Sequence, residues 1–219
     1  MKVQLISYSQ GAGVLGGVEN VRDLVAFCAR VSNPSNQINT ETADKLLNYL
    51  IKHKHWSPFE MVSACLEIET TRDIARQILR HRSFSFQEFS QRYANPDQEF
   101  DEMFVKREAR LQDEKNRQNS VEVDDKELEL EWFRIQSRVQ WMAEKQYKKA
   151  IKLGIAKEQA RALLPEGLTV SRLYMNGTLR SWIHYIELRR ENGTQKEHME
   201  IALACAEVIN KIFPYFEND

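Results

Sequence analysis

The stretch RHRSFSFQEFSQRY, residues 80–93, sets three basic side chains next to one another and follows them with aromatic residues. Arg80, His81 and Arg82 must either lie in water or face an anion, because a buried charge without a partner is costly. Three phenylalanines in the same stretch argue against complete solvation. The pattern therefore predicts a binding site for an anionic ligand.

Beyond Arg82 the aromatic residues favour an extended chain over a helix. In an extended chain Glu88, Ser90 and Arg92 point the same way, at intervals of about 7 Å. This face offers an acceptor, a hydroxyl and a guanidinium, the groups that bind the ribose, base and phosphate of a nucleotide. A surface strand with an ordinary Glu–Arg pair is the alternative, but the neighbouring RHR triplet favours a phosphorylated ligand.

Residues 71–82, which lead into the triplet, are expected to form a helix. Arg72, Arg76 and Arg80 follow one another at i, i+4 and i+8, so they form a basic stripe on that helix. Basic stripes are most often solvated, and we expect this of Arg72. Arg80 differs because it also belongs to the triplet.

Length and composition limit the class of protein. A chain of 219 residues supports one good core, so we expect a single domain over residues 1–219. Its 31 basic and 32 acidic side chains argue against electrostatic binding of nucleic acid. Three widely spaced cysteines suit a reducing cytosol, and the sequence has no metal-ligand spacing. The polar N-terminus and the lack of a long apolar run predict a cytoplasmic protein that does not enter a membrane.

Hydrophobic periodicity predicts an α+β fold with more helix than sheet. The expected strands are residues 2–8, 61–69 and 168–175. The expected helices are one capped by Asn20, one that begins at Thr40, residues 71–82, 124–153, 156–164 and 178–190, and a last helix that ends before Pro214.

Two segments are expected to lie outside this pattern. Seventeen of the thirty-three residues at 95–127 are charged and the apolar ones keep no period, so we expect a mobile insertion or lid. Our hypothesis is that it orders over the site or at a subunit edge.

GAGVLGG, residues 11–17, spells GxGxxG after a strand, but no second strand with a terminal acid follows. We interpret it as a flexible turn.

Several blocks of the sequence resemble, in the same order, those of the flavin-dependent thymidylate synthases. The RHR triplet, seven further residues and then Ser90 look like the signature of that family. Four other blocks are similar to family blocks: CARVSNP near residue 30, HKHWSPFE at 53–60, ARALLP at 160–165 and RSWIHYIELR at 180–189. The resemblance covers most of the chain except the charged insertion.

The resemblance implies a reaction and its cofactors. The reaction is the methylation of dUMP to dTMP, with methylenetetrahydrofolate as carbon donor, tightly bound FAD as hydride carrier and NADPH as reductant. It also implies a homotetramer whose active sites are assembled from several subunits. The implied fold is a single domain in which helices flank a central, mainly antiparallel sheet.

Site residues are implied by their places in the matching motifs. Those implied to bind the flavin are Ser57, Arg80, His81, Arg82, Glu88, Thr178, Arg180 and His184, with His55 and Glu60 beside them. Those implied to bind dUMP are Gln77, Arg80, Glu88, Phe89, Ser90, Gln91, Arg92, Arg161 and Arg189. Arg92 and Arg161 suit the phosphate, which carries nearly two negative charges at neutral pH. The predicted anion is then twofold, the flavin pyrophosphate and the nucleotide phosphate.

Arg189 matches the residue credited in the family with activating the uracil ring. Carbon 5 must become nucleophilic without a cysteine adding at carbon 6, and a guanidinium beside N3 and O4 would favour the anionic ring. Being permanently cationic, Arg189 would act electrostatically and not as a base. Ser90 is then a substrate ligand and not a nucleophile.

Two positions depart from the family pattern. Many members have Asn where this chain has Thr178, and His where it has Gly193. Both positions lie near the flavin in the family, so we expect FAD affinity or geometry to differ. His184 becomes the expected ring neighbour.

Two alternative functions remain open. A nucleotide- or single-stranded nucleic-acid-binding module would use the triplet for phosphates and Phe84, Phe86 and Tyr93 for stacking. A different flavoenzyme on the same scaffold would bind FAD but not use dUMP as acceptor. Salt-dependent binding of oligonucleotides without flavin would support the first, and bound FAD without nucleotide-dependent turnover would support the second.

Overall fold

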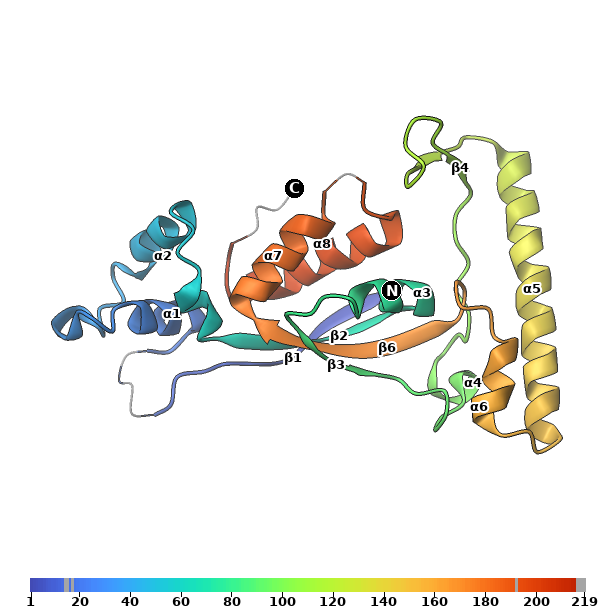
Figure 1. Ribbon diagram of the computed structural model, residues 1–219, viewed down its shortest axis with the longest axis horizontal. Helices are drawn as coiled ribbons and strands as arrows, with labels where there is room; N and C mark the ends of the chain where they lie inside the picture. Colours follow the sequence, from blue (N-terminus) through green and yellow to red (C-terminus); the bar gives the residue numbers. More distant parts are fainter. Residues whose placement is uncertain (14–15, 17, 192, 216–219) are drawn as a thin grey trace.

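The computed structural model describes residues 1–13, 16, 18–191 and 193–215. Its centre is a four-stranded sheet in which every neighbouring pair is antiparallel (Figure 1). In spatial order the strands are β1 (Lys2–Tyr8), β2 (Ser63–Thr71), β6 (Val170–Thr178) and β3 (Ser85–Glu88). The expected α+β class and antiparallel sheet are confirmed. Of the glycine-rich turn at 11–17, residues 14, 15 and 17 lie outside the described residues.

The two central strands explain which face of the sheet is buried. β2 and β6 pair over their whole length, and side chains alternate between the two faces along each strand. Leu66 and Met175, directly opposite each other, are fully buried on one face. Glu69 and Arg172 lie opposite each other on the other face, where they form an ion pair at 2.9 Å. The sheet is therefore apolar on one side and polar on the other.

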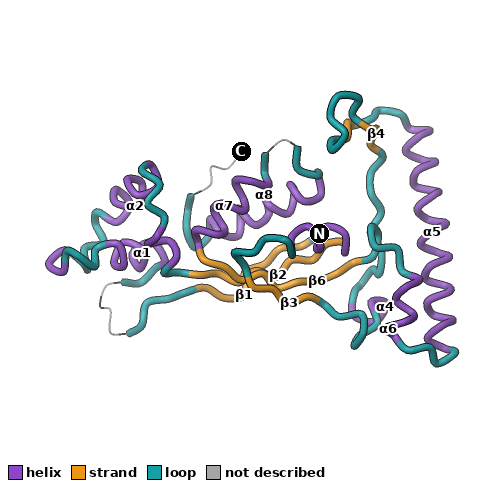
Figure 2. The backbone as a smooth tube through the Cα atoms, viewed as in Figure 1, coloured by secondary structure: helices purple, strands orange, loops and turns teal. Residues whose placement is uncertain are grey.

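Three helices cover the apolar face of the sheet. They are α3 (Arg72–Ile78), α7 (Leu179–Arg189) and α8 (Lys196–Asn210). Figure 2 shows all three on the same side of the sheet. Ile74, Trp182 and Ile209 are fully buried there, one from each helix. The indole N–H of Trp182 donates to the carbonyl of Ala64 at 3.0 Å, so the polar atom of the largest core side chain is satisfied.

The chain between β1 and β2 forms a helical end of the molecule (Figure 1). It contains α1 (Val21–Ala29), the 3₁₀ turn η1 (Pro34–Asn36), α2 (Ala43–Lys52) and the 3₁₀ turn η2 (Ser57–Glu60). The Asn20 side chain accepts from the N–H of Asp23 at 2.9 Å, which confirms its role as the N-cap of α1. The next helix begins at Ala43 and not at Thr40, because the Ala43 N–H first closes a turn on the Thr40 carbonyl.

The opposite end of the molecule is built around one long helix that stands apart from the sheet (Figure 1). Its elements are α4 (Pro96–Glu99), β4 (Arg110–Gln112), β5 (Ser120–Glu122), α5 (Lys126–Lys152), α6 (Lys157–Ala160) and the 3₁₀ turn η3 (Arg161–Leu163). Only Gln136 and Tyr147 are buried along α5. The Gln136 amide exchanges two hydrogen bonds of 2.8 Å with the backbone of Arg107, which ties the helix to the preceding segment. No helix in the described ranges combines the length and apolarity needed to cross a membrane.

The charged segment at 95–127 contains defined elements in this structure. β4 and β5 form an antiparallel hairpin within it. Arg110 of β4 is ion-paired with Glu197 of α8, and Lys196 binds Glu122 of β5 at 2.9 Å. The hairpin is thereby attached to the first turn of α8. The hypothesis that this segment acts as a lid stays a prediction.

Three local expectations around the RHR triplet are corrected. The helix is α3 and ends at Ile78, because after the Leu79 cap the N–H groups of Arg80 and His81 bond three residues back in place of four. The strand ends at Glu88, and the Ser90 carbonyl accepts from the N–H of Tyr93 at 3.0 Å in a turn. Ser90 and Arg92 therefore do not continue the face of Glu88.

Arg72 is the third correction, because it is not solvated. Its side chain is 16% exposed and lies 3.6 Å from the carboxylate of Glu88. The side of α3 that carries Arg72 faces the edge strand β3. This strand supplies Glu88, the acid that a partly buried arginine needs as a partner.

Candidate functional site

The arginine predicted to be catalytic lies against the histidine of the RHR triplet. The Nε–H of Arg189, in the last turn of α7, donates to Nε2 of His81 at 3.0 Å. Burial, together with Arg189 and Arg80, lowers the pKa of His81 to about 4, so the imidazole is neutral and able to accept. Within the described part of the chain no partner is found for the terminal nitrogens of Arg189. They are available to an acceptor on a ligand.

The two arginines of the triplet are exposed cations. Neither Arg80 nor Arg82 forms an ion pair with any described residue, and both side chains are exposed. The arginines further back on the same helix behave differently, because Arg72 and Arg76 are each paired with a glutamate. Two guanidiniums on residues two positions apart, both without acidic partners among the described residues, have the chemistry of an anion site.

Gln77, a predicted dUMP ligand, links α3 to α8. Its Nε2 donates to Oε1 of Gln195 at 2.7 Å, and its Oε1 lies 3.2 Å from Nδ1 of His198. His198 is fully buried and was not predicted from the sequence. The sequence does contain an indication: His198 lies three residues before Ile201, on the apolar face of the last helix. A histidine at such a position is buried and needs polar partners.

The two departures from the family pattern have local explanations. The Thr178 hydroxyl accepts from the N–H of Ser181 at 3.3 Å and caps α7. Asparagine and threonine both cap helices, so this function survives the change. Gly193 has φ of +100°, in the left-handed region that a histidine enters only with strain.

The start of α7 gathers the other residues predicted for the flavin. Arg180 is ion-paired with Glu60 of η2, and the ring of His184 packs edge-on against Trp56 with centroids 4.9 Å apart. Ser57 is exposed at the first position of η2. These contacts bring η2 and the first turns of α7 together.

The edge strand holds Glu88 in a fixed place. The Ser171 hydroxyl donates to its carboxylate at 2.8 Å, and Arg72 lies 3.6 Å away. The next residue, Phe89, packs edge-on against Phe100 with centroids 4.9 Å apart. A carboxylate held in this way is a preorganised hydrogen-bond acceptor.

The remaining predicted dUMP ligands lie further along the chain. Ser90 is half-buried, and Gln91 is only 3% exposed. Arg92 is exposed and lies 3.4 Å from Glu158 of α6, and Arg161 is exposed at the start of η3. No hydrogen bond or ion pair between described residues joins Arg92 or Arg161 to the Arg189 pair. Within one chain, the residues predicted for dUMP therefore do not form a single site: Arg92 and Arg161 are separate from the Arg189 pair.

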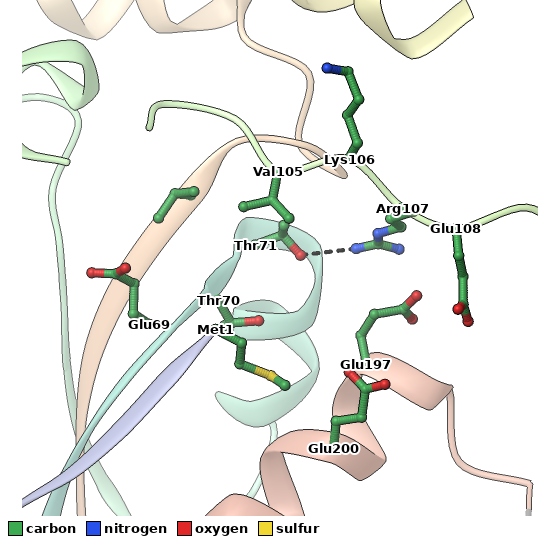
Figure 3. A pocket seen from close by; sticks show the side chains of 11 residues that line it. Met1, Glu69, Thr70, Thr71, Val105, Lys106, Arg107, Glu108, Glu197 and Glu200 are labelled. Atoms are coloured by element: carbon green, nitrogen blue, oxygen red, sulfur yellow. Dashed lines mark hydrogen bonds between the residues drawn. The ribbon is translucent and has the colours of Figure 1, made fainter. Parts of the chain in front are cut away.

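A cavity of about 220 Å³ lies elsewhere, between the end of β2, residues 105–108 and the start of α8 (Figure 3). In Figure 3 Arg107 points towards Thr71, to which it donates at 2.9 Å. The same guanidinium lies 2.7 Å from both carboxylate oxygens of Asp73, so its charge is neutralised. None of the residues predicted for the flavin or dUMP is among the described residues that line this cavity.

The cysteines are not activated for nucleophilic chemistry. Burial raises the pKa of the thiols of Cys28 and Cys65, and it raises that of the fully buried Cys205 further. A thiol attacks as its thiolate, and burial without a cation disfavours that form.

Comparisons with known proteins give a consistent result. A family described as thymidylate synthase complementing protein matches residues 14–215. The chain is 50% identical to a probable flavin-dependent thymidylate synthase of Paramecium bursaria Chlorella virus 1, over 98% of this chain and 96% of that protein. It is 49% identical to a flavin-dependent thymidylate synthase of Synechocystis sp., with the same shares of the two chains covered.

A solved structure shows the same fold. The UMP/dUMP methylase PolB from Streptomyces cacaoi, bound with 5-Br dUMP, aligns with a TM-score of 0.76. The alignment covers 96% of this chain and 90% of PolB at 24% identity.

Proposed function

The chain belongs to the family of flavin-dependent thymidylate synthases, and from this premise we propose that it catalyses the reductive methylation of dUMP to dTMP. In the proposed reaction methylenetetrahydrofolate donates the carbon and NADPH is the reductant. The observation that carries the proposal is the contact between Arg189 and the neutral His81, because it orients a cation whose charge is not cancelled by an acid.

Arg189 acts on the uracil ring by electrostatics. Its Nε is committed to His81, which fixes the plane of the guanidinium, and the terminal nitrogens, which have no partner among the described residues, bind the ligand. A guanidinium cannot lose its proton near neutral pH, so it stabilises negative charge on the ring while carbon 5 attacks. A protonated His81 could not accept the Nε–H, so the depressed pKa of this histidine is part of the arrangement.

The donors of the RHR triplet fit FAD. Arg80 and Arg82 are exposed, two positions apart and free of ion pairs with described residues, and two guanidiniums suit the two phosphates of the flavin. Ser57, Arg180 and the other residues at the start of α7 supply further polar contacts. When bound, FAD supplies the hydride that completes the methyl group.

The proposed dUMP ligands divide by chemistry. Glu88, held by Ser171, accepts from a ribose hydroxyl, and Gln77 donates an N–H. Arg92 and Arg161 bind the phosphate, which matches their exposure and charge. Because no contact joins these two arginines to Arg189 among the described residues, the complete site is proposed to form between subunits.

No cysteine takes part in the proposed reaction. The raised pKa of Cys28, Cys65 and Cys205 supports this, because a thiolate would be needed for addition at carbon 6 of the ring. The unpaired thiols also support a reducing compartment, and we place the enzyme in the cytoplasm.

The proposed homotetramer is supported by an exposed apolar stripe on α5. Its five side chains are between 36% and 48% exposed: Leu128, Trp132, Ile135, Val139 and Met142. They alternate at intervals of four and three residues, which is the spacing of the seam between two packed helices. A run of this kind is typical of a surface that another subunit covers.

The test is direct synthesis. Purified protein is incubated with dUMP, methylenetetrahydrofolate, FAD and NADPH, and dTMP is measured by chromatography beside reactions that lack FAD or contain Arg189→Ala. We expect product that requires FAD and falls sharply in the variant. A folded protein that retains FAD but makes no dTMP would contradict the proposal and indicate a flavoenzyme with another acceptor.

A further inference from the structure

Five side chains, four from three helices and one at the residue before α8, form a continuous row of hydrogen bonds next to the Arg189 pair. His198 on α8 lies between the Tyr185 hydroxyl, 3.1 Å from its Nε2, and the Gln77 side-chain oxygen, 3.2 Å from its Nδ1. Gln77 donates to Gln195 at 2.7 Å, and Gln195 donates to Oε2 of Glu197 at 2.8 Å. We call this row the α8 relay.

The direction of every bond in the α8 relay follows from the charge on Glu197. Burial raises the pKa of this carboxyl, but hydrogen bonds and two neighbouring arginines bring it below the ordinary value, so it is ionised and only accepts. Gln195 must then donate from its amide nitrogen and accept at its oxygen, and Gln77 must do the same. His198 is left to donate from Nδ1 and to accept from Tyr185 at Nε2. One arrangement of protons satisfies all five side chains.

His198 has to be neutral in this arrangement. Burial, followed by Arg189 and His81, lowers its pKa to about 4. Its ring is fully buried, so its Nδ1–H is held in place and is not shared with water. The tautomer is therefore set by the relay itself.

The α8 relay decides what Gln77 offers to a ligand. The amide oxygen accepts from His198, and one amide N–H is donated to Gln195. The second N–H has no partner among the described residues. Without His198 the amide is held only through its N–H to Gln195, so it can rotate about that bond and the second N–H no longer points in a fixed direction.

We propose that His198 is a positioning residue for dUMP, which holds the oxygen of the Gln77 amide and so fixes the direction of the free N–H that faces the nucleotide. His198 acts through Gln77 and does not touch the substrate. The inference rests on the proposed function, because it takes dUMP as the ligand of Gln77. It adds a residue outside the RHR triplet to the determinants of nucleotide binding.

The test is a double-mutant cycle on FAD-loaded protein, with the KM, the kcat and the calorimetric Kd for dUMP as readouts. His198→Leu should raise the KM and Kd for dUMP about tenfold, the size of one lost hydrogen bond, and lower kcat less. In a Gln77→Ala background the same change should have no further effect on either constant. His198→Asn should restore most of the affinity, because the asparagine amide nitrogen replaces Nδ1 as donor.

Ile209→Val is the matched control, a small loss of packing on the same helix. It should leave the KM for dUMP unchanged. If the two changes are additive in the cycle, or if His198→Asn binds no better than His198→Leu, His198 is structural and the inference is wrong while the proposed function stands. A wild-type protein that neither binds nor methylates dUMP would overturn both.

Discussion

The Nε of Arg189 donates to Nε2 of His81 at 3.0 Å, although the two residues stand 108 positions apart in the sequence. Guanidiniums in proteins usually pair with carboxylates, and here the partner is a neutral imidazole with a pKa lowered to about 4. The contact orients Arg189 and leaves its charge uncompensated. An electrostatic role in the reaction needs this combination, because a neutralised cation would stabilise little developing charge.

Replacing Arg189 tests separately whether its charge and its orientation by His81 are needed. Arg189→Ala should lower kcat by about 10²- to 10³-fold, the usual effect of losing one stabilising group at a developing charge. Arg189→Lys keeps the charge but cannot hold His81 and the ring at once with a planar fork, so it should recover little activity. Steady-state kinetics with dUMP measures both variants. Full recovery by lysine would show that charge alone matters and that the contact with His81 does not.

The half-buried His81 and the fully buried His198 should make the fold sensitive to acid. The pKa of His81 and of His198 is about 4 in the folded protein and about 6.5 when unfolded. Between these values the unfolded chain binds more protons, so the free energy of unfolding falls as pH falls from about 6.5 towards 4. We expect a loss of about 1 kcal/mol for each histidine by pH 5.5, after allowance for solvent screening.

Urea denaturation from pH 7.5 to 5 measures this loss. His198→Asn should reduce the dependence on pH, because one of the two groups is removed. Ile201→Val, a packing change on the same helix, should lower the free energy of unfolding by the same amount at every pH and leave its dependence on pH unchanged. A free energy of unfolding that is flat over this range would show that the histidines are protonated in the folded protein.

Elements with a strong local signal were predictable from the sequence. The strand at 2–8 has the expected bounds, the Asn20 cap is present, and α5 lies within two residues of its expected ends. Each depends on residues close together in the chain: a period of two, a capping side chain or a long helical period. Local propensity and tertiary structure agree in these segments.

The residues around the triplet were harder to predict because their conformations depend on distant partners. The burial of Arg72 is explained by Glu88 on another element. The edge strand ends at Glu88, where its ladder with β6 ends, and propensity alone cannot locate that point. His198 was missed because its partners, Gln77 and Tyr185, come from two other helices.

Thr178 should be replaceable by asparagine but not by valine. Its hydroxyl caps α7 by accepting from the Ser181 N–H, and an asparagine side chain can accept in the same way. Thr178→Val keeps the shape and removes the acceptor, so it should cost about 1 kcal/mol of stability. Urea denaturation compares the two variants, and equal losses would show that the cap contributes nothing. FAD retention, measured on the same samples, tests whether this position also affects the flavin.

The apolar stripe of α5 should control both assembly and activity. Val139→Glu places a charge in the middle of the stripe, which neither a dry interface nor a neighbouring apolar residue can accommodate. Light scattering should then show a smaller species, and dTMP synthesis should fall with it, because the proposed site needs Arg92 and Arg161 from another subunit. Lys149→Glu places a glutamate at an exposed position of the same helix beyond the end of the stripe and should leave the tetramer intact. A Val139→Glu protein that remains a fully active tetramer would exclude the stripe as the interface and require another surface of the chain to complete the site.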